Sequence, residues 1–274
     1  MVGYPFDEVD GENHLLVPIF AVRVYLCGHP KPHSMQEFAA WTPESYEAVV
    51  SILLTAACFG IYWFLAISEP IKARFFANHP TEKAWIRFVF YQKMMGVLWL
   101  GIVPGIIVLT TTDFTLTTLG LNLQGLGESA TYIGIMGVLI LVMNFFSTRK
   151  AEHQAYYPQM RVAVWTPKVL FINGFAWFAY LFAYEFLFRG ILLFLCYPLL
   201  GFWPSVAINL ALYSTTHIPK GAGETFGTFL YGLILCYVTI STGSFLVAFV
   251  THLIMALSND LFSIYHSKTM RVGR

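Results

Sequence analysis

Long apolar stretches dominate this sequence and fix the solvent in which the chain folds. A membrane-spanning helix needs about 20 mostly apolar residues, and segments 48–67, 92–109 and 130–146 each come close to that length. Hydrophobic residues make up 57% of the chain and charged residues 11%, whereas charged residues form about 25% of a soluble domain. The sequence therefore predicts an all-α, polytopic transmembrane helix bundle.

The second half of the chain is denser in apolar residues. It supplies the predicted spans 202–217, 226–240 and 244–264, preceded by one long segment, 168–200. As a continuous helix that long segment would measure about 50 Å at ~1.5 Å per residue, which exceeds the ~30 Å hydrocarbon core. We therefore expect it to be tilted, projecting or broken. The predicted count is about seven spans, within a range of six to eight.

The basic residues give an orientation. Two links between spans, 68–91 and 147–167, together with Lys168, carry half of them, and link 110–129 contains neither lysine nor arginine. Because cytoplasmic loops are enriched in these residues, the two basic links should face the cytoplasm. Following the seven spans from these links predicts a cytoplasmic C-terminus, a cytoplasmic turn at Lys220 and a site that opens toward the cytoplasmic side of a cell membrane.

Four regions follow from this pattern. Residues 1–47 form an N-terminal extramembrane or interfacial segment with an apolar patch at 15–26, and they lack the basic start of a signal peptide. Residues 48–167 hold the first transmembrane helices, and 265–274 form a tail. Residues 168–264 form the helix bundle that holds the candidate site.

Charge and cysteine content exclude other classes of protein. A net charge of +1 gives no basic stripe for nucleic acid, so no nucleic-acid partner is expected. The four cysteines show no paired framework, and we interpret them as buried thiols: Cys27, Cys58, Cys196 and Cys236. The composition indicates a lipid bilayer as one partner and leaves the oligomeric state open.

Ionisable residues inside the apolar segments are the candidate site. A charged side chain at bilayer depth costs about 2.5 kcal/mol or more, so each one is a functional hypothesis. Glu185 and Arg189 have the i, i+4 spacing of an ion pair, which is either structural or catalytic. His217 follows Tyr213 by one helical turn at the end of its span. His252 lies well inside an apolar helix, and together these residues favour one shared site.

Asn259 is a further catalytic candidate, and the secondary candidates are Tyr184, Tyr213, Asp260 and Glu224. Helical geometry places Asn259 within ~20° of the face of His252 and Asp260 about 80° away. Asp260 is nevertheless the stronger acid–base group, so both remain candidates. Glu224 is interpreted first as an acid that complements the dipole at a helix N-terminus.

Three motifs in this region resemble those of a known family, the CAAX prenyl proteases and bacteriocin-processing enzymes, which are intramembrane proteases. The motifs read YEFLFRG at 184–190, YSTTH at 213–217 and HLIMA at 252–256. The resemblance covers about residues 168–261. Tyr184 stands where the family usually has a first glutamate, as in a bacterial branch with a single glutamate, and Ala256 stands where it has an asparagine.

The resemblance implies a peptide hydrolase whose partner is a peptide, a bacteriocin precursor or a membrane protein. Glu185 with His217 would activate a water molecule, and His252 would stabilise the oxyanion of the tetrahedral intermediate. Asn259 is the candidate replacement for the donor missing at Ala256. No cofactor is implied.

Three alternatives remain open. Glu185, His217 and His252 form a recognised zinc ligand set, although the local H-E-x-x-H signature is absent. A transporter also concentrates such residues inside its bundle. A non-catalytic binding or immunity protein would tolerate Tyr184 and Ala256.

Overall fold

The computed structural model describes residues 42–273, so the interfacial segment expected at 15–26 lies outside the described residues. Within 42–273 the chain is almost entirely helical, which confirms the predicted all-α class. The first half forms, in order, α2 (Pro43–Ala66), α3 (Glu69–Asn78), α4 (Thr81–Gly96), the π-helix η1 (Val97–Ile102), α5 (Val103–Thr111), α6 (Leu126–Ser147) and α7 (Ala151–Tyr156).

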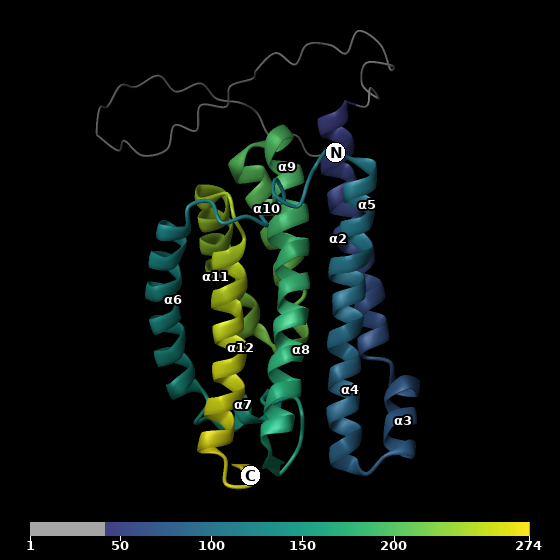
Figure 1. Ribbon diagram of the computed structural model, residues 1–274, viewed down its shortest axis with the longest axis vertical. Helices are drawn as coiled ribbons and strands as arrows, with labels where there is room; N and C mark the ends of the chain where they lie inside the picture. The colour runs from purple at the N-terminus through teal and green to yellow at the C-terminus, as the bar shows by residue number, and fades with distance from the viewer. Residues whose placement is uncertain (1–41, 274) are drawn as a thin grey trace, which may run out of the picture. The chain divides into compact units, whose positions relative to one another are not determined.

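The second half begins with a short strand and continues as the helices that carry the candidate site (Figure 1). These elements are β1 (Val164–Trp165), α8 (Pro167–Glu185), the π-helix η2 (Phe186–Leu192), α9 (Leu193–Leu200), α10 (Phe202–Thr215), the 3₁₀ turn η3 (Ile218–Lys220), α11 (Ala222–Thr242), α12 (Leu246–His266) and β2 (Arg271–Val272).

Six helices in the described part of the chain are long and apolar enough to cross a membrane. They are Pro43–Asn78, Thr81–Thr111, Leu126–Ser147, Pro167–Leu200, Ala222–Thr242 and Leu246–His266. The seventh predicted span, 202–217, contains α10, whose 14 residues measure about 21 Å and are too short for the ~30 Å core. The protein is therefore a multi-pass membrane protein with a count inside the predicted range.

Local sequence explains where the principal helices begin. Thr42 caps α2: its side chain accepts a hydrogen bond from Ser45 N, and the Ser45 hydroxyl in turn accepts one from the Thr42 backbone N–H. Such a capping box satisfies amide groups that the helix itself leaves unpaired. Thr166 caps α8 through a single bond, in which its side chain accepts from Val169 N, and a proline follows at the first helical position, where its missing N–H costs nothing.

The rod from Pro167 to Leu200 occupies the centre of the bundle. Of the most apolar 18-residue stretch of this rod, 72% is buried, a larger share than in any other of the six long helices. The segment is one continuous helical rod of 34 residues, so the predicted break is wrong, and tilt and projection stay predictions. A π-helical stretch, η2, lies between α8 and α9. A π-bulge inserts extra backbone into a helix and is frequent at functional sites. This one begins directly after Glu185.

Polar contacts hold α12 against its neighbour α6. The Asn144 side chain of α6 donates to Met255 O at 3.0 Å and to the Ser258 hydroxyl at 2.7 Å. Interhelical hydrogen bonds of this kind contribute about 0.6 kcal/mol or more each inside a membrane. The opposite face of α6 exposes large apolar side chains, as a lipid-facing helix does: Ile135, Val138, Leu139, Val142, Met143 and Phe146.

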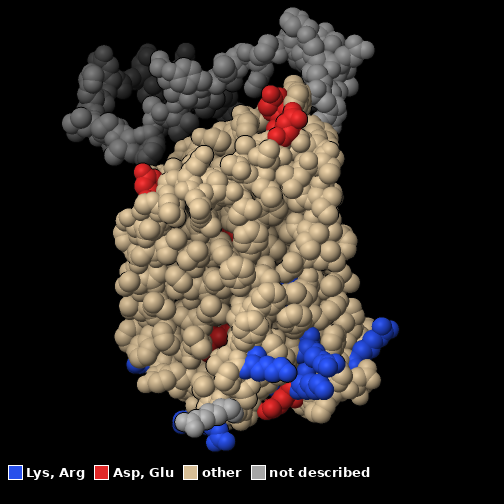
Figure 2. Space-filling view, in the orientation of Figure 1, with Lys and Arg blue, Asp and Glu red and all other residues tan. Residues whose placement is uncertain are grey.

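The two ends of the bundle differ in charge. Lys and Arg side chains gather at the end where α4 and α8 begin, with an acidic side chain among them, whereas the charged side chains visible at the other end are acidic (Figure 2). We call these the basic end and the acidic end. At the basic end β1 pairs in parallel with β2, with Val164 opposite Arg271, so the chain after α12 is fastened to the segment before α8.

Candidate active site

Glu185 lies at the junction between α8 and the π-helix η2, and its side chain is fully buried. Arg189, inside η2 and equally buried, places Nη1 3.2 Å from Glu185 Oε2. The contact is an ion pair rather than an aligned hydrogen bond, since both atoms lack a hydrogen-bond partner among the described residues. Each charge compensates the cost of burying the other.

His252 reaches the same carboxylate from α12. Its Nδ1 lies 2.6 Å from Glu185 Oε1. A carboxylate can only accept, so Nδ1–H donates and Nε2 is left without the proton whenever the ring is neutral. The histidine side chain is 14% exposed, whereas Glu185 is 0% exposed. Nε2 is therefore the part of this pair that a small molecule can approach.

His217 belongs to a neighbouring hydrogen-bonded chain. The Thr216 hydroxyl donates to Tyr213 O at 2.7 Å, lies 2.9 Å from His217 Nδ1 and 2.8 Å from the Tyr184 hydroxyl. Because the threonine proton is used on the carbonyl, its oxygen accepts from both the histidine and the tyrosine. This arrangement fixes Nδ1–H on His217 and leaves Nε2 of His217 as an acceptor.

Aromatic rings connect the two parts of the site. Tyr184 meets His252 and Tyr213 edge to face, with ring centroids 5.7 Å and 6.0 Å away. Tyr213 lies beside His217 at 5.0 Å and under the Arg189 guanidinium at 4.0 Å. The structure thus gathers Glu185 and Arg189 with His252, and it places His217 behind tyrosines rather than in hydrogen-bond contact with Glu185.

Asp260 lies in a second buried polar cluster, eight residues along α12 from His252, or about 12 Å. Its Oδ2 accepts from Asn173 Nδ2 at 2.8 Å and from Trp177 Nε1 at 2.7 Å, both on α8. The ammonium of Lys93 on α4 lies 3.2 Å from the centre of the Trp177 ring. Asp260 is therefore buried toward α8, but away from Glu185.

Asn259 is also buried, yet it faces a different element. Its Oδ1 lies 3.1 Å from His153 Nε2 on α7, and burial lowers the pKa of His153. Asn259 thus does not join the Glu185–His252 pair, although its helical angle favoured it over Asp260. The reason is position along the axis, since seven residues advance about 10 Å.

Glu224 forms an ion pair with Lys220 at 2.7 Å in the first turn of α11. Lys220 Nζ also lies 3.4 Å from the hydroxyl of Tyr157, the residue after α7. This contact ties the turn after His217 to the basic-end link.

Within residues 42–273, no three His, Cys, Asp or Glu side chains lie close enough to share a metal ion. Of the three residues in the alternative zinc ligand set, only Glu185 and His252 are in contact, and His217 Nδ1 is engaged with Thr216. Ala256 is buried one turn beyond His252 and offers no side-chain donor. Cys58, Cys196 and Cys236 are buried free thiols, as expected, and Cys27 lies outside the described residues.

Sequence reasoning missed Thr216 and Lys93. Thr216 directly precedes a motif histidine, and a hydroxyl at that position is the signal that could have identified it. Lys93 stands at the start of the predicted span 92–109, where a lysine is expected to extend to the membrane surface. The helix actually begins at Thr81, so Lys93 lies about 18 Å along it.

A fully buried carboxylate paired with an arginine and with a histidine from a second membrane helix is the kind of site that hydrolases use to orient an imidazole. The family described as Type II CAAX prenyl endopeptidase Rce1-like matches residues 164–258, about a third of the chain. The match includes all three motifs, so this region is similar to an endopeptidase family. No curated protein and no solved structure matches the chain.

Proposed function

We propose that the protein is an intramembrane endopeptidase of the CAAX protease and bacteriocin-processing type. The observation that carries the proposal is the 2.6 Å contact between Glu185 and His252, inside a segment similar to an endopeptidase family. A purely structural ion pair needs only Glu185 and Arg189. A partly exposed imidazole on the same carboxylate is the addition that hydrolysis requires.

The geometry favours a division of labour in which Glu185 acts through His252. Both carboxylate oxygens face protein groups and the side chain is fully buried, so water reaches the pair at His252 Nε2. There His252 would take a proton from the attacking water and later give it to the leaving amine, while Glu185 stabilises the imidazolium. This scheme differs from the roles that the family resemblance implies, in which Glu185 is the base and His252 the oxyanion donor.

His217 would bind the same water or the substrate through Nε2. Thr216 holds its other nitrogen as a donor, so Nε2 of the neutral ring is an acceptor that can orient a water proton. Tyr184, in place of the family's first glutamate, contributes to this by hydrogen bonding to Thr216. The scheme involves no metal or other cofactor.

The substrate would be a peptide or a membrane protein. The basic end would face the cytoplasm of a cell membrane, because lysine and arginine concentrate there, and substrate would approach from that side or laterally from its leaflet. These assignments rest on charge placement and on the similarity to an endopeptidase family.

The direct test is proteolysis of a peptide and membrane-protein library by the full chain in liposomes, with Glu185→Gln as the comparison. We expect cleavage by the wild type and a loss of at least about 10²-fold in Glu185→Gln. Matched detergent-extracted yield and melting temperature show that the variant still folds. The absence of cleavage by both proteins would favour a non-catalytic relative, for which Ala256 and Tyr184 are the sequence argument.

A further inference from the structure

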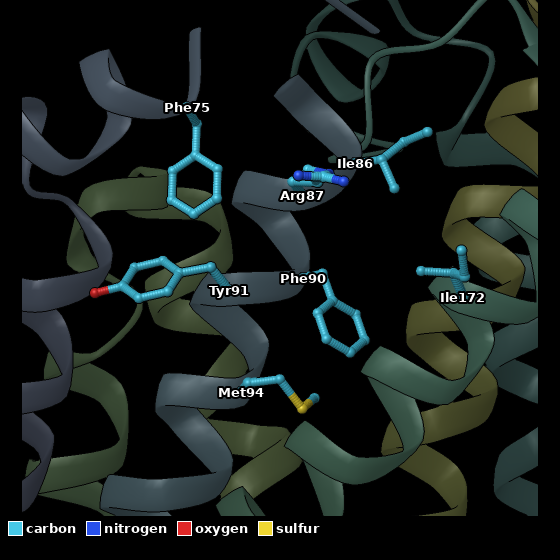
Figure 3. A pocket seen from close by; sticks show the side chains of 7 residues that line it. All are labelled: Phe75, Ile86, Arg87, Phe90, Tyr91, Met94 and Ile172. Atoms are coloured by element: carbon cyan, nitrogen blue, oxygen red, sulfur yellow. The ribbon is translucent and has the colours of Figure 1, made fainter. Parts of the chain in front are cut away.

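A surface groove lies between α3, α4 and α8 near the basic end, with a cavity volume of about 560 Å³ (Figure 3). Apart from one guanidinium, its walls are aromatic and aliphatic: Phe75, Ile86, Arg87, Phe90, Tyr91, Met94 and Ile172. Its size falls within the range of pockets that bury small ligands, about 300–1,000 Å³. An apolar groove on a membrane-spanning surface is filled in the bilayer by something apolar.

Arg87 gives this groove a charged end. Figure 3 shows it beside Phe75, with Met94 at the far end. The guanidinium is exposed, and its Nη1 donates to His79 Nε2 at 2.7 Å. No carboxylate within residues 42–273 lies at ion-pairing distance from it. Lys83, one turn away on α4, is also exposed, so the mouth is cationic without an internal counter-ion.

We propose that this groove binds an anionic phospholipid. One acyl chain would lie along Phe90, Met94 and Ile172, and the phosphate would accept hydrogen bonds from Arg87. A guanidinium fork matches a phosphate in charge and shape, and basic pockets between transmembrane helices near the membrane surface bind acidic headgroups. The complementary charge and the apolar path leading away from it together select a lipid over a soluble anion.

The site is separate from the one proposed for peptide hydrolysis. Ile172 and Glu185 are 13 residues apart on α8, which is about 20 Å along the helix axis. Lipid binding can therefore be measured in a catalytically silent protein such as Glu185→Gln, and its failure is distinguishable from a failure of the proposed peptidase activity.

The test is a lipid titration of the detergent-purified full chain by native mass spectrometry, with phosphatidylglycerol and phosphatidylcholine of identical acyl chains. We expect the wild type to prefer phosphatidylglycerol about fivefold or more, the factor expected for about one basic contact. Arg87→Gln should lose that preference, and Arg87→Lys should keep most of it. Ile172→Trp should fill the groove and weaken both lipids.

Matched controls separate the groove from general charge and bulk effects. Lys150→Gln removes an exposed charge from the basic end at the link after α6, and Phe171→Trp enlarges the exposed neighbour of Ile172. Both should bind lipid as the wild type does. Equal preference in Arg87→Gln and wild type, an equal loss in Lys150→Gln, or unchanged binding in Ile172→Trp would each overturn the proposal. So would a lipidated peptide occupying the groove where diacyl lipids do not bind.

Discussion

His252 Nδ1 lies 2.6 Å from Glu185 Oε1 across 67 residues of sequence. The contact joins α12 to the junction of α8 and η2, and no local pattern brings these segments together. Arg189 holds the other carboxylate oxygen, so the imidazole has a fixed position and a fixed donor nitrogen. Several expected outcomes depend on this one relationship.

Substituting His252 should remove catalysis without unfolding the protein. His252→Gln should lower the peptidase rate by about 10²–10⁴, the usual contribution of a general base. Since Glu185 acts through the same imidazole, the double variant with Glu185→Gln should be hardly slower than either single variant. Rates of the three variants in liposomes check this. Effects that multiply fully would show that the two residues work independently.

Arg189 should matter for stability as well as for activity. Arg189→Met leaves Glu185 charged and unpaired in the core, which should cost about 3–5 kcal/mol of unfolding free energy. Removing both charges in Glu185→Leu with Arg189→Met should restore most of that loss while the enzyme stays inactive. Denaturation in detergent, read beside the peptidase rate, separates the two effects. A double variant as unstable as Arg189→Met would argue against the ion pair as the cause.

Tyr184 and Thr216 should differ in importance. Tyr184→Phe removes one hydrogen bond to Thr216 and keeps the Thr216–His217 contact, so most activity should remain. Thr216→Val removes the nearer of two acceptors of His217 Nδ1–H and leaves Tyr213 O at 3.2 Å. It should lower the rate more, by up to about tenfold for one hydrogen bond of about 1.4 kcal/mol. If both variants are inactive, the tyrosine hydroxyl itself takes part in the chemistry.

The rate should fall at acid pH. Only the unprotonated Glu185–His252 pair can accept a proton from water, so activity should be present above the apparent pKa of the pair and be lost below it. A pH profile of kcat/KM measures it. A rate that stays constant from about pH 4 to 8 would contradict an acid–base mechanism.

Cysteine labelling tests the orientation. In a background without the native thiols, Leu123→Cys at the acidic end should react with an impermeant thiol reagent in intact cells. Thr81→Cys at the basic end should react only after permeabilisation, because basic loops face the cytoplasm. Both positions are exposed. The reverse pattern would invert the topology, and labelling of both from outside would mean that an odd number of crossings between them has been misassigned.

The sequence was sufficient to predict the helix bundle and the ion pair within one helix. Hydrophobic length predicts six of the spans, because each must cross the same apolar thickness, and the i, i+4 rule predicts Glu185 with Arg189. Hydrophobic length was wrong for the predicted span 202–217, where α10 contains only 14 residues. Hydropathy measures how apolar a segment is, but it does not detect where the helix ends before His217.

The contacts between helices could not be predicted from the sequence. Whether Asn259 or Asp260 approaches Glu185 depends on axial position, and the structure directs one to α7 and the other to α8. Lys93 was overlooked since its partner, the Trp177 ring, lies on another helix. Distances between separate helices follow from packing, which a single sequence does not specify.

The π-helix after Glu185 determines which neighbouring helices each half of the central rod packs against. A π-helical turn holds more residues than an α-helical turn, so it shifts the phase of everything that follows it. The part before it, α8, packs against α4 and α12, whereas α9 beyond it packs against α2 and α10. One crossing thereby presents different faces to two groups of neighbours. Deleting a single residue from 186–192 would undo that rotation and misalign α9 with α2, even though every charged residue were kept.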